Sequence, residues 1–120
     1  MKIGAPKEIA RGEARVALTP ESAKHLQKLG HECLIETGAG LAAGFNDDTY
    51  RDAGVTVAES ADALWRDAEV VIKVREPSDE EAERLREGQT LIAFFWPAQN
   101  EALLEKCKAQ GATVIAMDMV

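Results

Sequence analysis

Val70-Val71-Ile72-Lys73-Val74 is a nearly continuous run of β-branched residues, and Arg75-Glu76-Pro77 follows it directly. Runs that are apolar at consecutive positions, without alternation, are typical of strands buried on both faces of a parallel sheet. Short apolar runs recur at Ile3 and at residues 33–35, 55–57, 91–95 and 114–117. The sequence therefore predicts about six parallel strands, one for each run.

Signals for the start and end of helices separate these runs. Thr19 is a predicted N-cap with Pro20 at the first helical position, and Gly30 ends the same helix. Strands that alternate with helices require right-handed crossovers. The predicted fold class is therefore α/β, an open and mostly parallel sheet with helices on both faces, Rossmann-like or flavodoxin-like. The later helices are predicted to begin at Asn46 or Asp47, Ser60, Ser78 and Asn100.

The helix that begins at Ser78 is the most polar of these predicted helices. Ser78 and Glu81 have the spacing of a capping box, in which each side chain accepts a hydrogen bond from the other's backbone. Two pairs at helical neighbour spacing predict weak ion pairs along a solvated face: Glu80 with Arg84, and Glu83 with Arg86.

The composition suits one soluble globular domain, with 46% hydrophobic and 29% charged residues. The formal net charge of −7 repels phosphate backbones, so nucleic acid is excluded as a partner. The longest apolar stretch, residues 91–96, is far shorter than the roughly 20 residues of a membrane-spanning helix, and the N-terminus lacks the apolar centre of a secretory signal. We expect a chain that is neither embedded in a membrane nor exported. The two cysteines, Cys33 and Cys107, are interpreted as core-filling thiols of a reducing compartment.

Charged side chains follow the predicted first and fourth strands. In open α/β sheets, ligands bind outside the carboxyl ends of the strands. Lys73 and Arg75, two residues apart on one predicted strand, project to the same face, and Arg15 is able to join them from the first loop. Such a cationic corner would hold a carboxylate or a phosphate. The alternative is ordinary pairing of these cations with the nearby carboxylates of Glu8, Glu13 and Glu76.

A glycine-rich pattern at residues 38–43, Gly-Ala-Gly-Leu-Ala-Ala, matches the first part of a dinucleotide-binding fingerprint. That fingerprint needs a helix starting at its second glycine. Gly44 and the cap signal at Asn46 leave no room for this helix, so we interpret the pattern as a tight turn. His25 and His31 lack partners at metal-binding spacing and are interpreted as structural.

Several longer segments resemble the alanine dehydrogenase and pyridine nucleotide transhydrogenase family. They are residues 4–8 (Gly-Ala-Pro-Lys-Glu), 13–20 (Glu-Ala-Arg-Val-Ala-Leu-Thr-Pro), 36–40 (Glu-Thr-Gly-Ala-Gly) and 71–77 (Val-Ile-Lys-Val-Arg-Glu-Pro). The resemblance covers essentially the whole chain. Ala5 and the pair Ser22-Ala23 depart from the family's usual residues, at positions that carry no chemistry.

Within the family, the residue at position 96 distinguishes two activities. In the family's alanine dehydrogenases, a histidine after the fifth strand handles the substrate proton, while an arginine and a lysine hold the substrate carboxylate. Here the corresponding positions hold Trp96, Arg15 and Arg75. An indole N–H donates hydrogen bonds but exchanges no proton near neutral pH. Transhydrogenases pass hydride directly between two nicotinamides and need no acid or base from the protein, and residues 94–100, Phe-Phe-Trp-Pro-Ala-Gln-Asn, resemble their alpha subunit.

The transhydrogenase resemblance implies a homodimeric, NAD(H)-binding subunit with two α/β domains and no metal. Its implied partners are an NADP(H)-binding beta subunit and a membrane domain that moves protons, at the cytoplasmic side of the bacterial inner membrane. Because the sequence stops directly after a strand, we expect residues 1–120 to be the N-terminal domain of a longer subunit. Nicotinamide-contacting residues are expected after Val120 and in the second domain, so no catalytic or cofactor-binding residue is assigned here. The residues expected to line the cleft between the domains are Arg15, Lys73, Arg75 and Trp96.

Two alternatives remain open. An alanine-dehydrogenase-like enzyme would bind the carboxylate of a keto acid through Arg15 and Arg75, with another residue replacing the missing histidine. A free-standing module would use the cationic corner to bind a small anion without chemistry. If the chain is one domain of a longer protein, we further expect an exposed apolar patch near Phe94, Phe95, Val114 and Val120.

Overall fold

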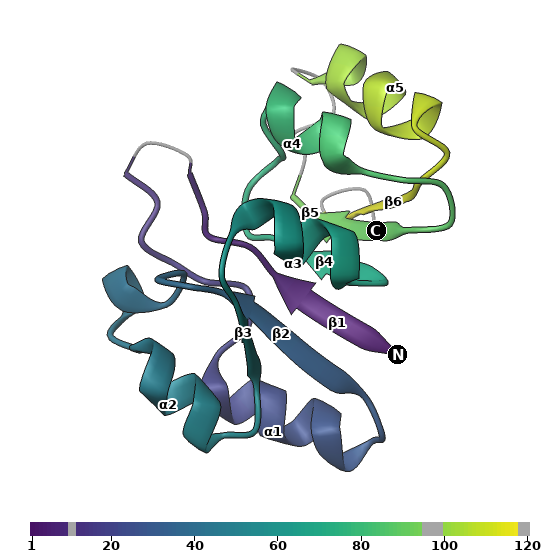
Figure 1. Cartoon of the computed structure of the whole chain (residues 1–120). Coiled ribbons are helices and arrows are strands. Elements are labelled where there is room, and N and C mark those ends of the chain that lie inside the picture. Colours follow the sequence, from purple (N-terminus) through teal and green to yellow (C-terminus); the bar gives the residue numbers. More distant parts are fainter. Residues whose placement is uncertain (10–11, 95–99, 118–120) are drawn as a thin grey trace.

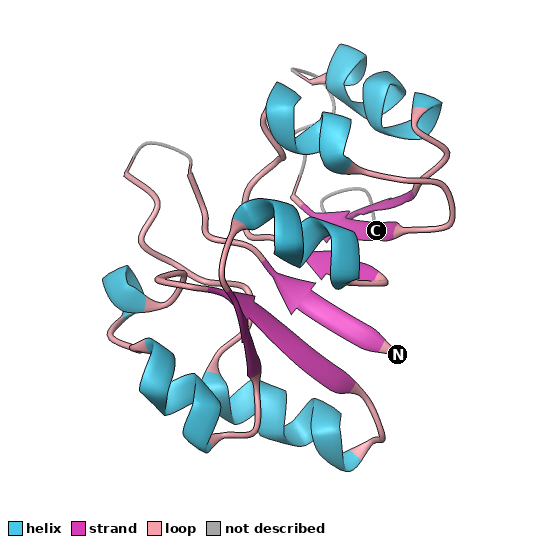
Figure 2. Ribbon diagram, viewed as in Figure 1, coloured by secondary structure: helices cyan, strands magenta, loops and turns pink. Residues whose placement is uncertain are grey.

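A single parallel sheet of six strands forms the centre of the molecule (Figures 1 and 2). The computed structural model describes residues 1–9, 12–94 and 100–117. The strand order is β3-β2-β1-β4-β5-β6, so the first strand of the sequence lies in the middle of the sheet. The predicted α/β class is confirmed. The strands are β1 (Lys2–Ala5), β2 (Glu32–Glu36), β3 (Thr56–Ala58), β4 (Val70–Ile72), β5 (Thr90–Ala93) and β6 (Thr113–Ala116).

Five α-helices cover the sheet in two groups. The first two helices pack on one face, over a cluster that includes Cys33, Ile35 and Tyr50. The other three pack on the opposite face, over a cluster that includes Trp65, Val71 and Leu91. Figure 1 shows the two groups on opposite sides of the strands. The helices are α1 (Pro20–Lys28), α2 (Asp47–Asp52), α3 (Ala61–Asp67), α4 (Asp79–Arg84) and α5 (Glu101–Ala109).

The predicted helix starts are confirmed at the level of individual caps. Thr19 and Ser60 accept hydrogen bonds from backbone N–H groups in the first turns of α1 and α3. At α2, Asn46 is the N-cap, while Asp47 is the first helical residue. Ser78 forms the expected capping box with Glu81 at α4. Asn100 precedes α5 as predicted, but its side chain makes no capping hydrogen bond.

The predicted ion pairs along α4 are replaced by contacts to neighbouring helices. Arg84 Nε donates to Asp62 Oδ1 of α3 at 2.8 Å. Glu83 Oε1 accepts from Lys106 Nζ of α5 at 3.2 Å. Because α4 packs between α3 and α5, these partners are within reach, and α4 is tied laterally to the helices on both sides.

One glycine permits close packing of α3 on the sheet. A Cβ atom added at Gly4 of β1 would lie 2.9 Å from Ala68 Cβ and 2.9 Å from Leu64 Cδ2. Real Cβ atoms do not approach so closely, so α3 contacts β1 at a distance that only glycine allows.

Part of the sheet stays uncovered on the side of α1 and α2. On β5 and β6, Ala93 and Ala116 face the cluster under α4 and α5, so their neighbours Phe94 and Ile115 face the opposite way. Phe94 is 43% exposed, Ile115 40% and Met117 44%. The described helices on that side of the sheet, α1 and α2, pack instead over the cluster that includes Cys33, Ile35 and Tyr50.

The predicted apolar patch is thus confirmed at Phe94 and wrong at Val114. Val114 is partly buried and packs against the cluster under α4 and α5, because alternation along β6 turns it inward. The other two predicted members, Phe95 and Val120, lie outside the described residues. Within the described part of the chain, no helix is both long and apolar enough to span a bilayer.

Candidate functional site

The site expected from the topology lies where β1 and β4 run side by side. From this pair the strand order runs outward on both sides, through β2 and β3 on one side and through β5 and β6 on the other. In parallel α/β sheets, such a reversal of strand order opens a ligand-binding crevice at the carboxyl ends of the strands. The loop after β1 and the loop after β4 meet there through Glu8. Its carboxylate accepts hydrogen bonds from Val74 N at 2.9 Å and Arg75 N at 3.2 Å.

Lys73 lies inside this junction rather than in an open cleft. Its Nζ is 3.1 Å from Glu8 Oε1 and 3.2 Å from Glu81 Oε2, and its side chain is 1% exposed. One ammonium between two buried carboxylates leaves this triad with a formal charge of −1. Of the two interpretations of Lys73 from sequence, ion pairing is the one observed, with Glu81 as an additional partner that sequence reasoning missed. The capping-box spacing identified Glu81 as a residue at the start of a helix, but no sequence pattern indicated its contact with Lys73.

β4 ends earlier than the sequence predicted, and this separates the two cations. The strand stops at Ile72, so Lys73 and Arg75 lie in the following loop instead of projecting from one strand face. The Lys73 ammonium points to Glu8 and Glu81. The Arg75 guanidinium lies 3.9 Å from Glu13 and 3.6 Å from Glu76.

Glu13 links Arg75 to Arg15. Its carboxylate accepts two hydrogen bonds from the Arg15 guanidinium, from Nη2 at 2.8 Å and from Nε at 2.9 Å, and one from Arg15 N at 2.9 Å. These hydrogen bonds from Arg15, with a smaller contribution from the positive charge of Arg75, lower the pKa of Glu13 to about 2. Glu13 is therefore ionised at neutral pH and unsuited to act as a general acid. The Glu13 side chain is 4% exposed while that of Arg15 is 70% exposed, so a buried carboxylate presents an outward-facing guanidinium.

A hollow of about 160 Å³ lies beside Arg15 at the carboxyl edge of β1 and β2. The part of Arg15 that Glu13 does not engage is available there for an anion such as a carboxylate or a phosphate. The arrangement supplies binding and orientation, because the carboxylate of Glu13 is engaged by Arg15 and that of Glu8 by the loop after β4. The lining residues are Lys7, Glu8, Glu13, Ala14, Arg15, Gly38, Ala39, Leu41 and Ala42.

The glycine-rich turn on the far wall of this hollow is not a dinucleotide fingerprint. Leu41–Ala43 is a short 3₁₀ helix that ends at Gly44, whose φ of 92° lies in the left-handed region. Asp47 satisfies the turn from within the protein. Its carboxylate accepts hydrogen bonds from Thr37 Oγ1 and, at 2.9 Å, from Gly38 N, and these hydrogen bonds lower the pKa of Asp47. A carboxylate of the protein thus takes the role that a phosphate would have at a true fingerprint.

The structure therefore brings two of the four predicted cleft residues together and places a third, Lys73, apart from them. Arg15 and Arg75 share Glu13, whereas Lys73 belongs to a separate buried triad. Trp96 lies outside the described residues. Among the residues that the structure describes, no group of three or more histidine, cysteine, aspartate or glutamate side chains is arranged to hold a metal ion.

Similar proteins place this geometry in context. Over its full length, the chain is 68% identical to NAD(P) transhydrogenase subunit alpha of Cereibacter sphaeroides and 42% identical to alanine dehydrogenase of Halomonas elongata. It spans 23% of the former protein and 32% of the latter. A solved transhydrogenase structure from Sinorhizobium meliloti superposes with a TM-score of 0.92 and 35% identity, over 99% of this chain and 35% of that one.

The family comparison agrees with the motifs noted in the sequence. The model of the family described as "Alanine dehydrogenase/PNT, N-terminal domain" matches residues 4–120. The matched range contains the whole sheet from Gly4 onward, the Glu13–Arg15 pair and the Lys73 triad. The chain belongs to the alanine dehydrogenase/PNT N-terminal domain family.

Proposed function

We propose that this chain is the N-terminal domain of the NAD(H)-binding alpha subunit of an NAD(P) transhydrogenase, which transfers hydride between NAD(H) and NADP(H). The observation that carries the proposal is the contrast in similarity: 68% identity to a transhydrogenase alpha subunit against 42% to an alanine dehydrogenase, each over all 120 residues. Trp96 supports the same choice, since the family's alanine dehydrogenases are expected to carry a proton-transferring histidine at that position.

The chemistry of the described carboxyl edge is consistent with direct hydride transfer. That reaction needs two nicotinamide rings to be positioned and a proton donor is not required. The edge supplies fixed loops rather than acid–base groups: Glu8 ties the β1 and β4 loops together, and Glu13 is held ionised by Arg15. We assign this domain a positioning role, as one wall of a cleft whose other wall is a second domain.

The remaining parts of the assignment follow from the proposed subunit. The nucleotide contacts are proposed to lie after Val120 and in the second domain, with Arg15, Arg75 and Trp96 facing the cleft. Lys73, given its burial, is reassigned to support of the cleft loops. The proposed assembly is a homodimer docked to an NADP(H)-binding beta subunit and a proton-moving membrane domain, at the cytoplasmic side of the bacterial inner membrane.

The second candidate function is an alanine-dehydrogenase-like oxidoreductase. The observation that favours it is the proximity of Arg15 and Arg75, which both contact Glu13 and lie at the positions where the family is expected to bind a substrate carboxylate. The bidentate hold of Glu13 on Arg15 weighs against it, because it leaves a substrate carboxylate only the part of that guanidinium that Glu13 does not engage.

The deciding experiment uses the longest native polypeptide that carries this N-terminus, in membranes of its host. We expect a mass several times 13.0 kDa and reduction of 3-acetylpyridine adenine dinucleotide by NADPH. We expect no NADH oxidation on addition of pyruvate and ammonia. NADH oxidation dependent on pyruvate and ammonia, without transfer between nucleotides, would establish the second candidate. A native mass of 13.0 kDa with neither activity would favour a small-anion binding module.

A further inference from the structure

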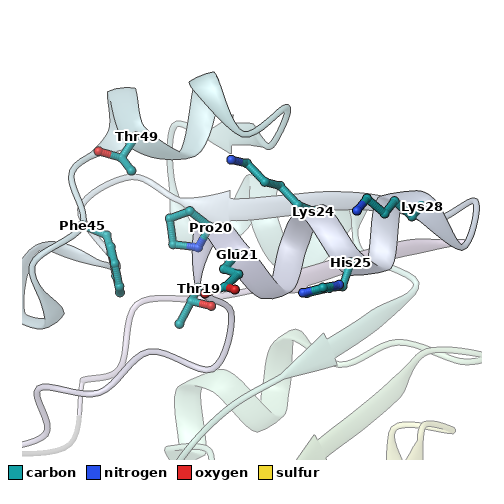
Figure 3. Close-up of a pocket in the computed structure, with 8 residues that line it drawn as sticks. All are labelled: Thr19, Pro20, Glu21, Lys24, His25, Lys28, Phe45 and Thr49. Carbon is teal, nitrogen blue, oxygen red and sulfur yellow. The ribbon is translucent and has the colours of Figure 1, made fainter.

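A second hollow lies away from the carboxyl edge, along α1. It has a volume of about 610 Å³ and runs between α1 and the loop that leads into α2 (Figure 3). We call it the α1 groove. Its lining residues are Thr19, Pro20, Glu21, Lys24, His25, Lys28, Phe45 and Thr49.

The α1 groove contains two of the lysines that this acidic chain leaves unpaired. In residues 1–9, 12–94 and 100–117, the lysine side chains with neither an ion pair nor a hydrogen bond are Lys2, Lys7, Lys24 and Lys28. Lys24 and Lys28 are four residues apart on α1, so their like charges are neighbours and repel each other. In a protein with a net charge of −7, two adjacent unpaired cations form a local site for negative charge.

The groove also has an apolar end. Phe45 and Pro20 lie at the N-terminal end of α1, and Lys24 and Lys28 follow along the helix (Figure 3). In this view the Lys24 ammonium extends from α1 toward Thr49, across the groove. Glu21 lies at the apolar end, and its negative charge repels a carboxylate of the ligand there. The apolar end therefore favours an uncharged side chain, whereas the lysines favour carboxylates.

The spacing of these positions matches an extended peptide. Residues four apart on a helix rise by about 6 Å, which separates Pro20, Lys24 and Lys28 by equal steps. In an extended chain, side chains on the same side recur about every 7 Å. In a peptide with an apolar residue followed by two acidic residues at alternate positions, the apolar side chain would therefore lie at Pro20 and the two acidic side chains at Lys24 and Lys28.

We infer that the α1 groove binds an extended acidic peptide segment of a partner protein, with an apolar side chain on Phe45 and Pro20 and two carboxylates on Lys24 and Lys28. A long, open groove fits a peptide better than a compact metabolite, which pockets usually enclose on most sides. The inference is independent of the proposed transhydrogenase function, because no group at the carboxyl edge takes part.

Titration of the ¹⁵N-labelled chain with a capped peptide, Leu-Thr-Glu-Thr-Glu or its reverse, tests this binding by NMR. We expect shifts of the amide signals of residues 20–28 and 45–49, and weaker binding at high salt. The double variant Lys24→Gln/Lys28→Gln is expected to weaken binding by about tenfold, as for the loss of two exposed ion pairs. The matched variant Lys2→Gln/Lys108→Gln removes the same charge elsewhere and is expected to bind like the parent.

Three results would overturn the inference. The first is the absence of shifts along α1, or shifts confined to other elements. The second is equal binding of the peptide Leu-Thr-Gln-Thr-Gln, which carries no carboxylate side chain. The third is an equal response to free glutamate at the same concentration of carboxylate, since the groove would then attract anions without recognising a segment.

Discussion

At the scale of single residues, Lys73 shows how a charged side chain is accommodated in the interior. A buried ion is costly to remove from water, and pairing with good geometry offsets that cost. Lys73 achieves this with Glu8 from the β1 loop and Glu81 from α4, so three separate elements meet at one ammonium. The triad determines where the loops of the carboxyl edge lie.

Removal of the ammonium is therefore expected to be strongly destabilising. Lys73→Met leaves two buried carboxylates facing each other, and we expect a loss of about 3–5 kcal/mol in the free energy of unfolding. Urea denaturation followed by circular dichroism measures it. Lys108→Met, at an exposed position of α5, serves as the matched control and is expected to change stability by less than about 0.5 kcal/mol. Equal effects of the two substitutions would show that the triad adds no stability.

The Glu13–Arg15 pair predicts a particular dependence on acid. The pKa of Glu13 is lowered from 4.5 to about 2 in the folded chain, chiefly by hydrogen bonds from Arg15. The folded state thus favours the ionised carboxylate, and its stabilising effect is present above pH 4.5 and is lost as the pH falls toward 2. We expect Glu13→Gln to be less stable than the parent at pH 7 and to approach it at pH 2. Thermal unfolding across this range tests it, and a difference that does not change with pH would contradict the assignment.

At the scale of elements, the contact between α3 and β1 depends on the absence of a side chain at Gly4. Gly4→Ala introduces a Cβ within 2.9 Å of Ala68 Cβ, which cannot rotate away. We expect a loss of about 1–3 kcal/mol, the usual cost of overpacking a core. The double variant Gly4→Ala/Ala68→Gly provides space for the new methyl group and is expected to recover part of the loss, as measured by chemical denaturation. Identical stability of the single and double variants would place the strain elsewhere.

The secondary-structure elements also show which features can be predicted from the sequence and which cannot. All six strands and the caps at Thr19, Ser60 and Ser78 were predictable, because apolar runs and capping side chains act on residues close in sequence. The partner of Arg84 and the second partner of Lys73, Glu81, were not, since they depend on which elements lie side by side after folding. Lysine has a flexible four-carbon chain, so its sequence neighbours say little about where the ammonium binds.

In the candidate site, too, some features were predictable from the sequence and others were not. The edge of the sheet that carries it was predictable from topology, and Arg15 was correctly placed at that edge. The role of Asp47 in satisfying the glycine-rich turn was not predictable, because this carboxylate reaches back across the loop to Gly38. The α1 groove was also missed, since its lysines have the spacing of an ordinary solvated helix face.

At the scale of the whole molecule, the half-covered sheet predicts self-association. Phe94, Ile115 and Met117 are exposed apolar side chains at the ends of the paired strands β5 and β6, and their contact with water is unfavourable. We expect the isolated 120-residue chain to associate in sedimentation velocity experiments as its concentration rises. Ile115→Thr/Met117→Lys is expected to raise the dissociation constant by about tenfold or more, given the apolar area removed.

The control for this prediction removes apolar side chains at other exposed positions. Leu29 is 74% exposed at the end of α1 and Leu41 is 62% exposed on the 3₁₀ turn. Leu29→Thr/Leu41→Lys is expected to leave association unchanged. A parent chain that stays monomeric at high concentration, or a control with the same effect as the β6 variant, would contradict a specific role for the uncovered face.

The central position of β1 also matters for a chain emerging from the ribosome. β1 is made before the other strands of this sheet, yet Ile3 pairs with Val70, which is synthesised 67 residues later (70 minus 3). Until then, one edge of the oldest strand has no neighbour and is a template for pairing with other nascent chains. The pairing that joins the two halves of this sheet therefore forms only after Val70 has been made.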